Sequence, residues 1–162
     1  MPNSIKTKFI LYYKKNLVSM TNGINNELSI VIDTCTLIKC YKNNSLLTLS
    51  KILRKNNFQM ILTDVVLHEI CKVLNYTKKL VFVKILKHFR NFKIISSTKN
   101  TINESQKLEN QFLELHYNDS SILAITKSTS SFLMSEDKKL RQTADLSGVP
   151  IYNFKQFVRC YA

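Results

Sequence analysis

Apolar residues along this chain form short β-branched or aromatic runs, which alternate with longer segments where they recur every three or four positions. The short runs predict strands, because β-branched and aromatic side chains suit a buried pleated surface. Five segments have this character, namely residues 29–32, 58–62, 92–95, 132–134 and 150–152. The pattern therefore predicts a sheet of four to five strands.

The segments between and after these runs have helical spacing. Leu37, Ile38 and Tyr41 lie on one side of a predicted helix. Another predicted helix runs through Leu80, Val83, Ile85, Leu86 and Phe89. Gly148 suits the left-handed position that closes a helix. We expect helices over residues 34–41, 46–53, 64–74, 80–89, 104–115, 119–126, 138–146 and 154–161.

Strands that alternate with helices are typical of a mostly parallel sheet covered on both faces. We therefore expect an α/β fold: a three-layer α/β/α sandwich with a mostly parallel central sheet of four to five strands, Rossmann-like in arrangement. Residues 1–28 precede the first predicted strand and form an N-terminal extension whose order the sequence leaves open. Residues 29–162 form a single domain. In such sheets the functional crevice lies outside the carboxyl ends of the strands.

Four acidic residues stand where this topology leads to that crevice. Asp33 and Asp137 follow predicted strands, Asp119 opens a predicted helix that Asn118 is expected to cap, and Glu69 lies on the helix after the second strand. Taken singly, Asp33, Asp119 and Asp137 each have an ordinary explanation as a helix cap or a solvated first turn, whereas Glu69 flanks an apolar stripe and is harder to explain that way. Taken together, they predict a cluster of carboxylates at one edge of the sheet.

The chain is otherwise poor in acid. Its 24 Lys and Arg against 11 Asp and Glu give a formal net charge of +13. Such an excess favours a polyanionic partner, with nucleic acid the first candidate, an anionic membrane surface the second and general solubility the alternative. A further basic segment comprises Lys84, Lys87 and Arg90, with Lys78 and Lys79 just before it.

Targeting and redox signals are weak. No apolar run approaches the ~20 residues of a membrane helix, and the N-terminal residues lack a signal-peptide core. We therefore expect no membrane association and a cytoplasmic location. The four cysteines form no C-x-x-C pair, which argues against a zinc knuckle.

The four acids predict a site for Mg²⁺ or Mn²⁺, because clustered carboxylates repel one another and hard divalent ions prefer carboxylate ligands. Such a site hydrolyses phosphodiester bonds by activating water and neutralising phosphate charge. Thr34 and Ser135 lie beside these acids and either orient a carboxylate or cap a helix. Lys138, Lys139 and Arg141 follow the fourth acid and either bind phosphates or form a solvated face.

The segments that carry the acids resemble, in order, the motifs of the PIN-domain ribonucleases. The likeness covers residues 29–155, most of the chain. The segments are Val31-Ile32-Asp33-Thr34, Val65-Val66-Leu67-His68-Glu69-Ile70, Asn118-Asp119-Ser120-Ser121-Ile122-Leu123-Ala124, Phe132-Leu133-Met134-Ser135-Glu136-Asp137-Lys138-Lys139-Leu140 and Gly148-Val149-Pro150-Ile151. Each motif is weak alone, and four in order are fairly specific. Two features depart from the family pattern: Asp64 stands where a proline is common, and residues 1–28 exceed the minimal toxin form.

The resemblance implies that residues 29–162 form a PIN-like, Mg²⁺- or Mn²⁺-dependent endoribonuclease domain acting on single-stranded RNA. It implies that Asp33, Glu69, Asp119 and Asp137 are the catalytic metal ligands. It also implies self-association as a homodimer and an antitoxin partner, since many members of this size are toxins of the VapBC type. Two other interpretations stay open: an RNA-processing nuclease without an antitoxin, and a catalytically inactive nucleic-acid-binding or assembly module.

Overall fold

The strand β1 (Leu28–Ile32) lies at the centre of the sheet, as its composition predicts. Ile30, Val31 and Ile32 are each 0% exposed, so the strand is covered on both faces. The computed structural model describes residues 27–162. The expected N-terminal extension over residues 1–28 therefore lies outside the described residues except for its last two, and Leu28 already belongs to β1.

Four further strands complete a sheet that is parallel throughout the described residues. They are β2 (Phe58–Thr63), β3 (Phe92–Ile95), β4 (Phe132–Met134) and β5 (Ile151–Tyr152). The strand order is β3-β2-β1-β4-β5. The chain adds β2 and β3 on one side of β1 and then β4 and β5 on the other, so the switch point of the topology lies between β1 and β4. Val31 pairs with Ile61 of β2 and Leu133 of β4, which aligns the carboxyl ends of the three central strands. Such a switch point is where a parallel sheet opens a crevice.

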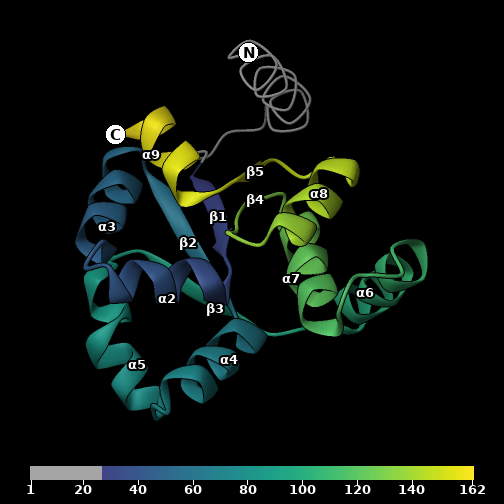
Figure 1. The fold of residues 1–162 in the computed structure, drawn as a ribbon, viewed down its shortest axis with the longest axis horizontal. Helices are drawn as coiled ribbons and strands as arrows, with labels where there is room; N and C mark the ends of the chain where they lie inside the picture. The colour runs from purple at the N-terminus through teal and green to yellow at the C-terminus, as the bar shows by residue number, and fades with distance from the viewer. Residues whose placement is uncertain (1–26) are drawn as a thin grey trace.

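Helices cover both faces of this sheet. Within residues 27–162 they are α2 (Thr34–Lys42), α3 (Leu46–Lys55), α4 (Asp64–Leu74), α5 (Lys78–Lys84), the 3₁₀ helix η1 (Leu86–His88), α6 (Lys99–Gln111), α7 (Tyr117–Ser128), α8 (Lys138–Leu146) and α9 (Phe154–Tyr161). Figure 1 shows α2 to α5 on one side of the strands and α6 to α8 on the other, as right-handed crossovers require. The predicted three-layer α/β/α sandwich is confirmed. None of the helices described is long and apolar enough to cross a membrane.

An aromatic cluster closes the amino end of the sheet. The Phe58 ring lies 5.7 Å from Phe132 and 5.5 Å from Phe157, both in edge-to-face contact. Tyr161 packs on Phe58 at 5.2 Å, so α9 is fastened to the starts of β2 and β4. Edge-to-face contacts of this kind add to the burial of the rings themselves.

The helix expected over residues 80–89 is interrupted. α5 ends at Lys84 and η1 begins at Leu86, with Ile85 between them at φ −114° and ψ −62°. The expected apolar positions are wrong at Leu80 and Val83, which are 38% and 51% exposed, whereas Val81 is 0% exposed. The other three expected positions are buried, namely Ile85, Leu86 and Phe89. Packing against the sheet selects the other side of this short helix.

Two helix starts also differ from prediction. α6 begins at Lys99 rather than at residue 104, because Thr98 and Thr101 form a reciprocal capping box. α7 begins at Tyr117 after His116, which makes no side-chain capping bond. The prediction that Asn118 caps this helix is therefore wrong, and Asn118 lies within the first turn. Gly148 has φ +74° after α8, the left-handed position predicted for it.

Candidate active site

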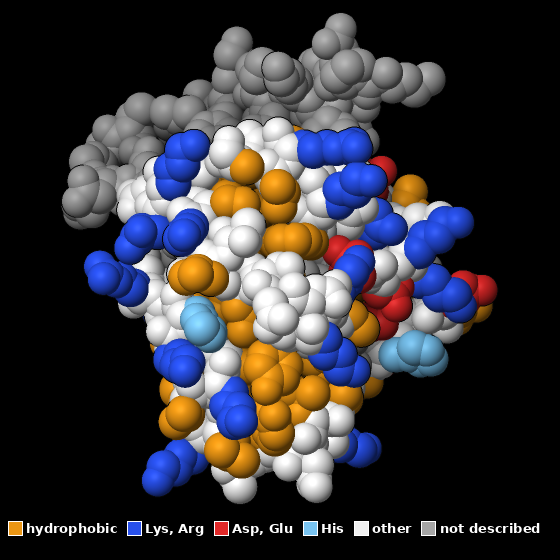
Figure 2. Space-filling model, turned by 60° about the vertical axis from the view of Figure 1, so that its left-hand side comes forward, with side chains coloured by type: hydrophobic (Ala, Val, Ile, Leu, Met, Phe, Trp, Pro, Cys, Tyr) orange, Lys and Arg blue, Asp and Glu red, His pale blue; other side chains and the backbone are white. Residues whose placement is uncertain are grey.

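The four predicted acids lie around the carboxyl ends of β1, β2 and β4. Asp33 follows β1 and caps α2, and Asp137 follows β4 by three residues and caps α8. Glu69 lies in the second turn of α4, the helix that follows β2. Asp119 lies in the first turn of α7. Figure 2 shows acidic side chains next to Lys and Arg on one part of this face, with further acids at its edge.

Asp33 is buried, with 3% of its surface exposed. Its Oδ1 accepts a hydrogen bond of 2.9 Å from the Thr36 backbone N–H, and its Oδ2 accepts one from the Ser135 hydroxyl. Burial raises the pKa of this carboxyl, the bonds from Ser135 and Thr36 partly offset that rise, and the Asp137 charge adds to it. The two hydrogen bonds fix the orientation of the Asp33 side chain, but burial still disfavours its negative charge.

Ser135 joins two of the acids. Its side chain is fully buried, donates to Asp33 and accepts a 3.0 Å bond from the Asp137 backbone N–H. Asp137 itself is exposed, and its Oδ1 accepts a 2.9 Å bond from Leu140 N–H at the start of α8. One hydroxyl therefore ties the end of β1 to the loop after β4.

Glu69 is held from two other elements. The hydroxyl of Thr34, in α2, donates to Glu69 Oε2. The side-chain amide of Asn118, in α7, donates to Oε1 at 2.5 Å. The sequence motif contains Asn118, but its expected role was a local cap, so this contact between α4 and α7 was missed. The sequence signal that could have revealed this contact was the position of Asn118 directly before the candidate ligand Asp119.

Asp119 completes the group. Burial, the largest cause, acts together with the charges of Asp137, Asp33 and Glu69 to raise the pKa of Asp119 to about 6, while His116 lowers it. The four carboxylates therefore act on one another electrostatically. Cys35 lies at the same place: its thiol is exposed at the rim, and burial and the same four acids raise its pKa.

Glu136 stands apart from this group, although it is next to Asp137 in the sequence. It forms a 2.7 Å ion pair with Lys39 and accepts a 2.8 Å bond from the Phe154 backbone N–H. Although burial opposes it, these donors and the Arg141 charge hold the pKa of Glu136 below its ordinary value. Its contacts connect α2 to α9, so it has a structural explanation.

The predicted phosphate-binding cations lie on α8. Lys138 and Lys139 are exposed, and Lys139 pairs with Glu114 at 3.6 Å on the surface. Arg141 is half-buried, and its Nε has no hydrogen-bond partner among the described residues. These side chains start from the turn that follows Asp137, on the same side of the sheet as the acids.

The donor chemistry fits a hard divalent cation. Four carboxylates lie around the carboxyl ends of the central strands, and a cation among them would relieve the repulsion that, after burial, raises the pKa of Asp119. Across residues 27–162, however, no three acidic, His or Cys side chains lie close enough together to ligate one ion as they stand. Asp33 and Glu69 instead have their oxygens engaged by protein donors.

Comparison with known proteins agrees with this arrangement. A protein-family model described as PIN domain matches residues 30–146. No curated protein sequence matches the chain.

Solved structures share the fold at low sequence identity. VapBC2 from Rickettsia felis, bound to a DNA fragment from its promoter, is 13% identical, with 78% of this chain and 98% of that chain covered and a TM-score of 0.63. VapBC-1 from nontypeable Haemophilus influenzae is 13% identical, with 79% and 99% covered and a TM-score of 0.62. The PIN domain endonuclease Utp24 is 17% identical, with 81% and 88% covered and a TM-score of 0.54.

Proposed function

Because the chain belongs to the PIN domain family, we propose that it is a divalent-metal-dependent endoribonuclease that hydrolyses phosphodiester bonds of single-stranded RNA. PIN domains are in general nucleases, which supports a hydrolase of nucleic acid. The observation that carries the proposal is that Asp33, Glu69, Asp119 and Asp137 all lie around the carboxyl ends of β1, β2 and β4. Four carboxylates gathered at one end of a parallel sheet repel one another unless a cation joins them.

We assign Asp33, Glu69, Asp119 and Asp137 as the residues that hold Mg²⁺ or Mn²⁺. When bound, the ion supplies a water of lowered pKa and a Lewis acid for the phosphate oxygens. Thr34 and Ser135 position two of the acids, because their hydroxyls donate to Glu69 and Asp33.

The basic surface supports RNA as the substrate. A net charge of +13 attracts a polyanion from a distance and raises its local concentration. Lys138, Lys139 and Arg141 are assigned to the phosphates beside the scissile bond, since α8 starts directly after Asp137. Their guanidinium and ammonium groups contribute position and charge rather than base recognition.

We further propose that the protein is the toxin of a toxin–antitoxin pair, acts in the cytoplasm and forms a homodimer. The likeness to VapBC2 and VapBC-1 supports an antitoxin partner. In a host cell, the wild-type chain is expected to arrest growth and the Asp33→Asn variant to be tolerated. Equal tolerance of both would instead favour an RNA-processing nuclease.

The enzymatic proposal is tested with labelled single-stranded RNA and Mn²⁺. We expect cleavage by the wild-type protein, none after EDTA treatment and none by Asp33→Asn. Glu104→Gln is the matched control, because it removes an acid whose 2.5 Å ion pair with Lys127 lies on the surface. It should cleave as the wild type does.

Two further readouts separate the parts of the proposal. Mn²⁺ should raise the melting temperature of the wild type more than that of Asp33→Asn, as any ligand of the native state does. Cleavage that persists equally in EDTA and in Asp33→Asn would overturn the metal assignment. Equal cleavage of single-stranded DNA would overturn the assignment to RNA.

A further inference from the structure

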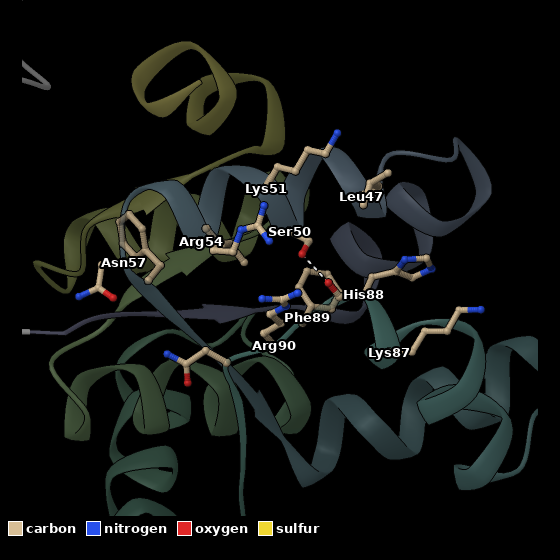
Figure 3. A pocket seen from close by; sticks show the side chains of 12 residues that line it. Leu47, Ser50, Lys51, Arg54, Asn57, Lys87, His88, Phe89 and Arg90 are labelled. Carbon is tan, nitrogen blue, oxygen red and sulfur yellow. Dashed lines mark hydrogen bonds between the residues drawn. The ribbon is translucent and has the colours of Figure 1, made fainter.

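A cavity of about 450 Å³ lies at the opposite edge of the sheet, away from the four acids. It is formed by α3 on one side and, on the other, by the segment that runs from η1 into the start of β3 (Figure 3). Its lining residues Phe58 and Asn91 stand at the starts of β2 and β3, which places it at the amino ends of the strands. We call it the amino-edge pocket.

The amino-edge pocket is cationic. Lys51 and Arg54 from α3 face Lys87 and Arg90 from the other wall, and no Asp or Glu lines the cavity. All four side chains are exposed, and none belongs to an ion pair within residues 27–162. One acid touches the rim, since Glu27 accepts a hydrogen bond from the Asn91 side chain. Residues 1–26 contain no acidic residue.

A hydrogen bond between its walls and two buried aromatic rings hold the amino-edge pocket in shape. Ser50, one position before Lys51, donates a hydrogen bond to the backbone carbonyl of His88, and this bond fixes the two walls together (Figure 3). Phe58 and Phe89 form part of the lining and are only 2% and 5% exposed. The apolar residues therefore supply a rigid base, and the charged ends of the long side chains remain available.

We propose that the amino-edge pocket binds backbone phosphates of the RNA strand, as a second contact distant from the site of cleavage. The identity of the anion rests on the proposed function. Two arginines and two lysines with no carboxylate partner match phosphate oxygens, which arginine binds through two parallel bonds. The Phe58 and Phe89 rings are too buried to stack on bases, so the four cations make the contact to phosphates rather than to bases.

Distance sets the length of RNA that uses both sites. β2 has six residues and spans roughly 20 Å from the pocket to the acidic edge, at ~3.3 Å per residue. A stacked strand advances ~3.4 Å per nucleotide, so about six nucleotides are needed to bridge that distance. A six-nucleotide RNA centred on the acids extends only about three nucleotides, roughly 10 Å, toward the pocket and does not reach it, whereas a thirty-nucleotide RNA reaches both.

Binding is measured by fluorescence anisotropy in EDTA, with Asp33→Asn present in every protein so that no cleavage occurs. Adding Arg54→Gln and Arg90→Gln is expected to weaken binding of a thirty-nucleotide RNA at least about tenfold, because charge-assisted bonds to two phosphates are lost. Binding of a six-nucleotide RNA should change less than about twofold. The matched control is Lys78→Gln with Lys79→Gln, which removes two exposed charges from outside the pocket and should change binding of either RNA less than about twofold.

Three results would overturn the proposal: the same loss in the control pair, the same loss with the six-nucleotide RNA, or unchanged binding in the arginine pair. Poly-glutamate of matched charge is the competitor for a protein partner, and AMP for a free nucleotide. If either displaces the long RNA from the pocket as well as unlabelled RNA does, the pocket is not an RNA site.

Folding is checked by thermal melting. If the arginine variant melts early, Lys51→Gln with Lys87→Gln provides the second test of the same pocket, with the same expected loss. Because these measurements need no catalysis, an RNA that binds at the pocket but is never cleaved would contradict the proposed function alone.

Discussion

The carboxyl ends of the parallel strands carry a group of acidic side chains, and the amino ends carry a group of basic ones. At the carboxyl ends, the four acids of the candidate site act on one another, and Asp33 is only 3% exposed. At the amino ends, the four cations of the amino-edge pocket are all exposed and lack carboxylate partners among its lining residues. Like charges are thus concentrated at each edge, but only at the acidic edge is a charged side chain, that of Asp33, buried.

This difference has a physical reason. Charges withdrawn from water need fixed donors, and Ser135, Thr34 and Asn118 supply them to Asp33 and Glu69. Charges left in water repel weakly and keep their side chains free. A small ion needs the first arrangement, and a long flexible polyanion tolerates the second. We therefore predict that metal binding and cleavage at the carboxyl edge depend on individual hydrogen-bonding atoms. RNA binding at the amino edge should depend on the total charge of the pocket.

The largest expected effect is at Asp137, and its sequence neighbour Glu136 provides the comparison. Asp137→Asn should reduce RNA cleavage more than about 100-fold, since even the partners of metal ligands are worth about 10–100-fold. Asparagine still caps α8, so the fold is retained. Glu136→Gln, at the adjacent position, should cost less than about threefold because its bonds go to Lys39 and Phe154. Cleavage rates are measured for both variants under saturating Mn²⁺. Equal losses in the two would show that Asp137 contributes no more to cleavage than its neighbour does.

The next effect concerns the hydroxyls that fix the acids. Thr34→Val and Ser135→Ala should each weaken Mn²⁺ binding about 10–100-fold, as loss of a ligand's supporting bond does. Thr34→Ser keeps the hydroxyl and should restore most of the affinity. Thr126→Val is the control, because its hydroxyl is buried but bonds only within α7, to the Ile122 carbonyl at 2.7 Å. Calorimetric titration with Mn²⁺ measures each affinity, and a similar loss in the control would point to general destabilisation.

A smaller effect is expected at the amino edge. Binding of long RNA weakens with salt, with a slope of about 0.7 per phosphate contacted on a single strand. Removing Arg54 and Arg90 should therefore reduce that slope by about 1.4. Anisotropy titrations between low and physiological salt measure the slope. A change that depended on RNA sequence rather than on salt would show that the pocket reads bases.

The smallest effect is on stability. The pKa of Asp119 is raised to about 6, above its ordinary 3.8, so between these values the folded state holds a proton that the unfolded state has released. In EDTA, stability should fall as the pH rises from about 4 to about 6 and then level off.

The Asp119→Asn substitution removes this dependence. At pH 7 it should raise the melting temperature by roughly 2–4 °C, the equivalent of about 1 kcal/mol, a value discounted because solvent screens a half-buried group. Melting curves across the pH range provide the measurement. A variant that melts earlier than the wild type at pH 7 would show that Asp119 stabilises the fold as a charge.

The sequence predicted the sheet because strand formation here depends on local composition. Ile30 to Ile32 and Leu133 to Met134 are runs that only a doubly covered strand can bury. The positions of Asp33 and Asp137 followed, since an acid after a parallel strand reaches the carboxyl edge whatever its neighbours are. Their roles as metal ligands remain predictions.

Other features depend on contacts between distant segments. Asn118 has the chemistry of a cap, but its amide bonds to Glu69, 49 positions away, and no local pattern encodes that choice. In α5, helical spacing permits Val81 or Val83 to face inward, and only packing selects Val81. The amino-edge pocket likewise exists because α3 packs against η1, and the two are more than thirty residues apart.

The strand order also affects how the chain is made. Asp33 belongs to the first strand of the sheet, but the hydroxyl that orients it comes 102 positions later, from Ser135. A ribosome releases the first acid long before β4 has emerged, so a half-synthesised chain has Asp33 without Ser135 or Asp137. Under the proposed function, the chain therefore lacks a complete site until its synthesis is nearly finished.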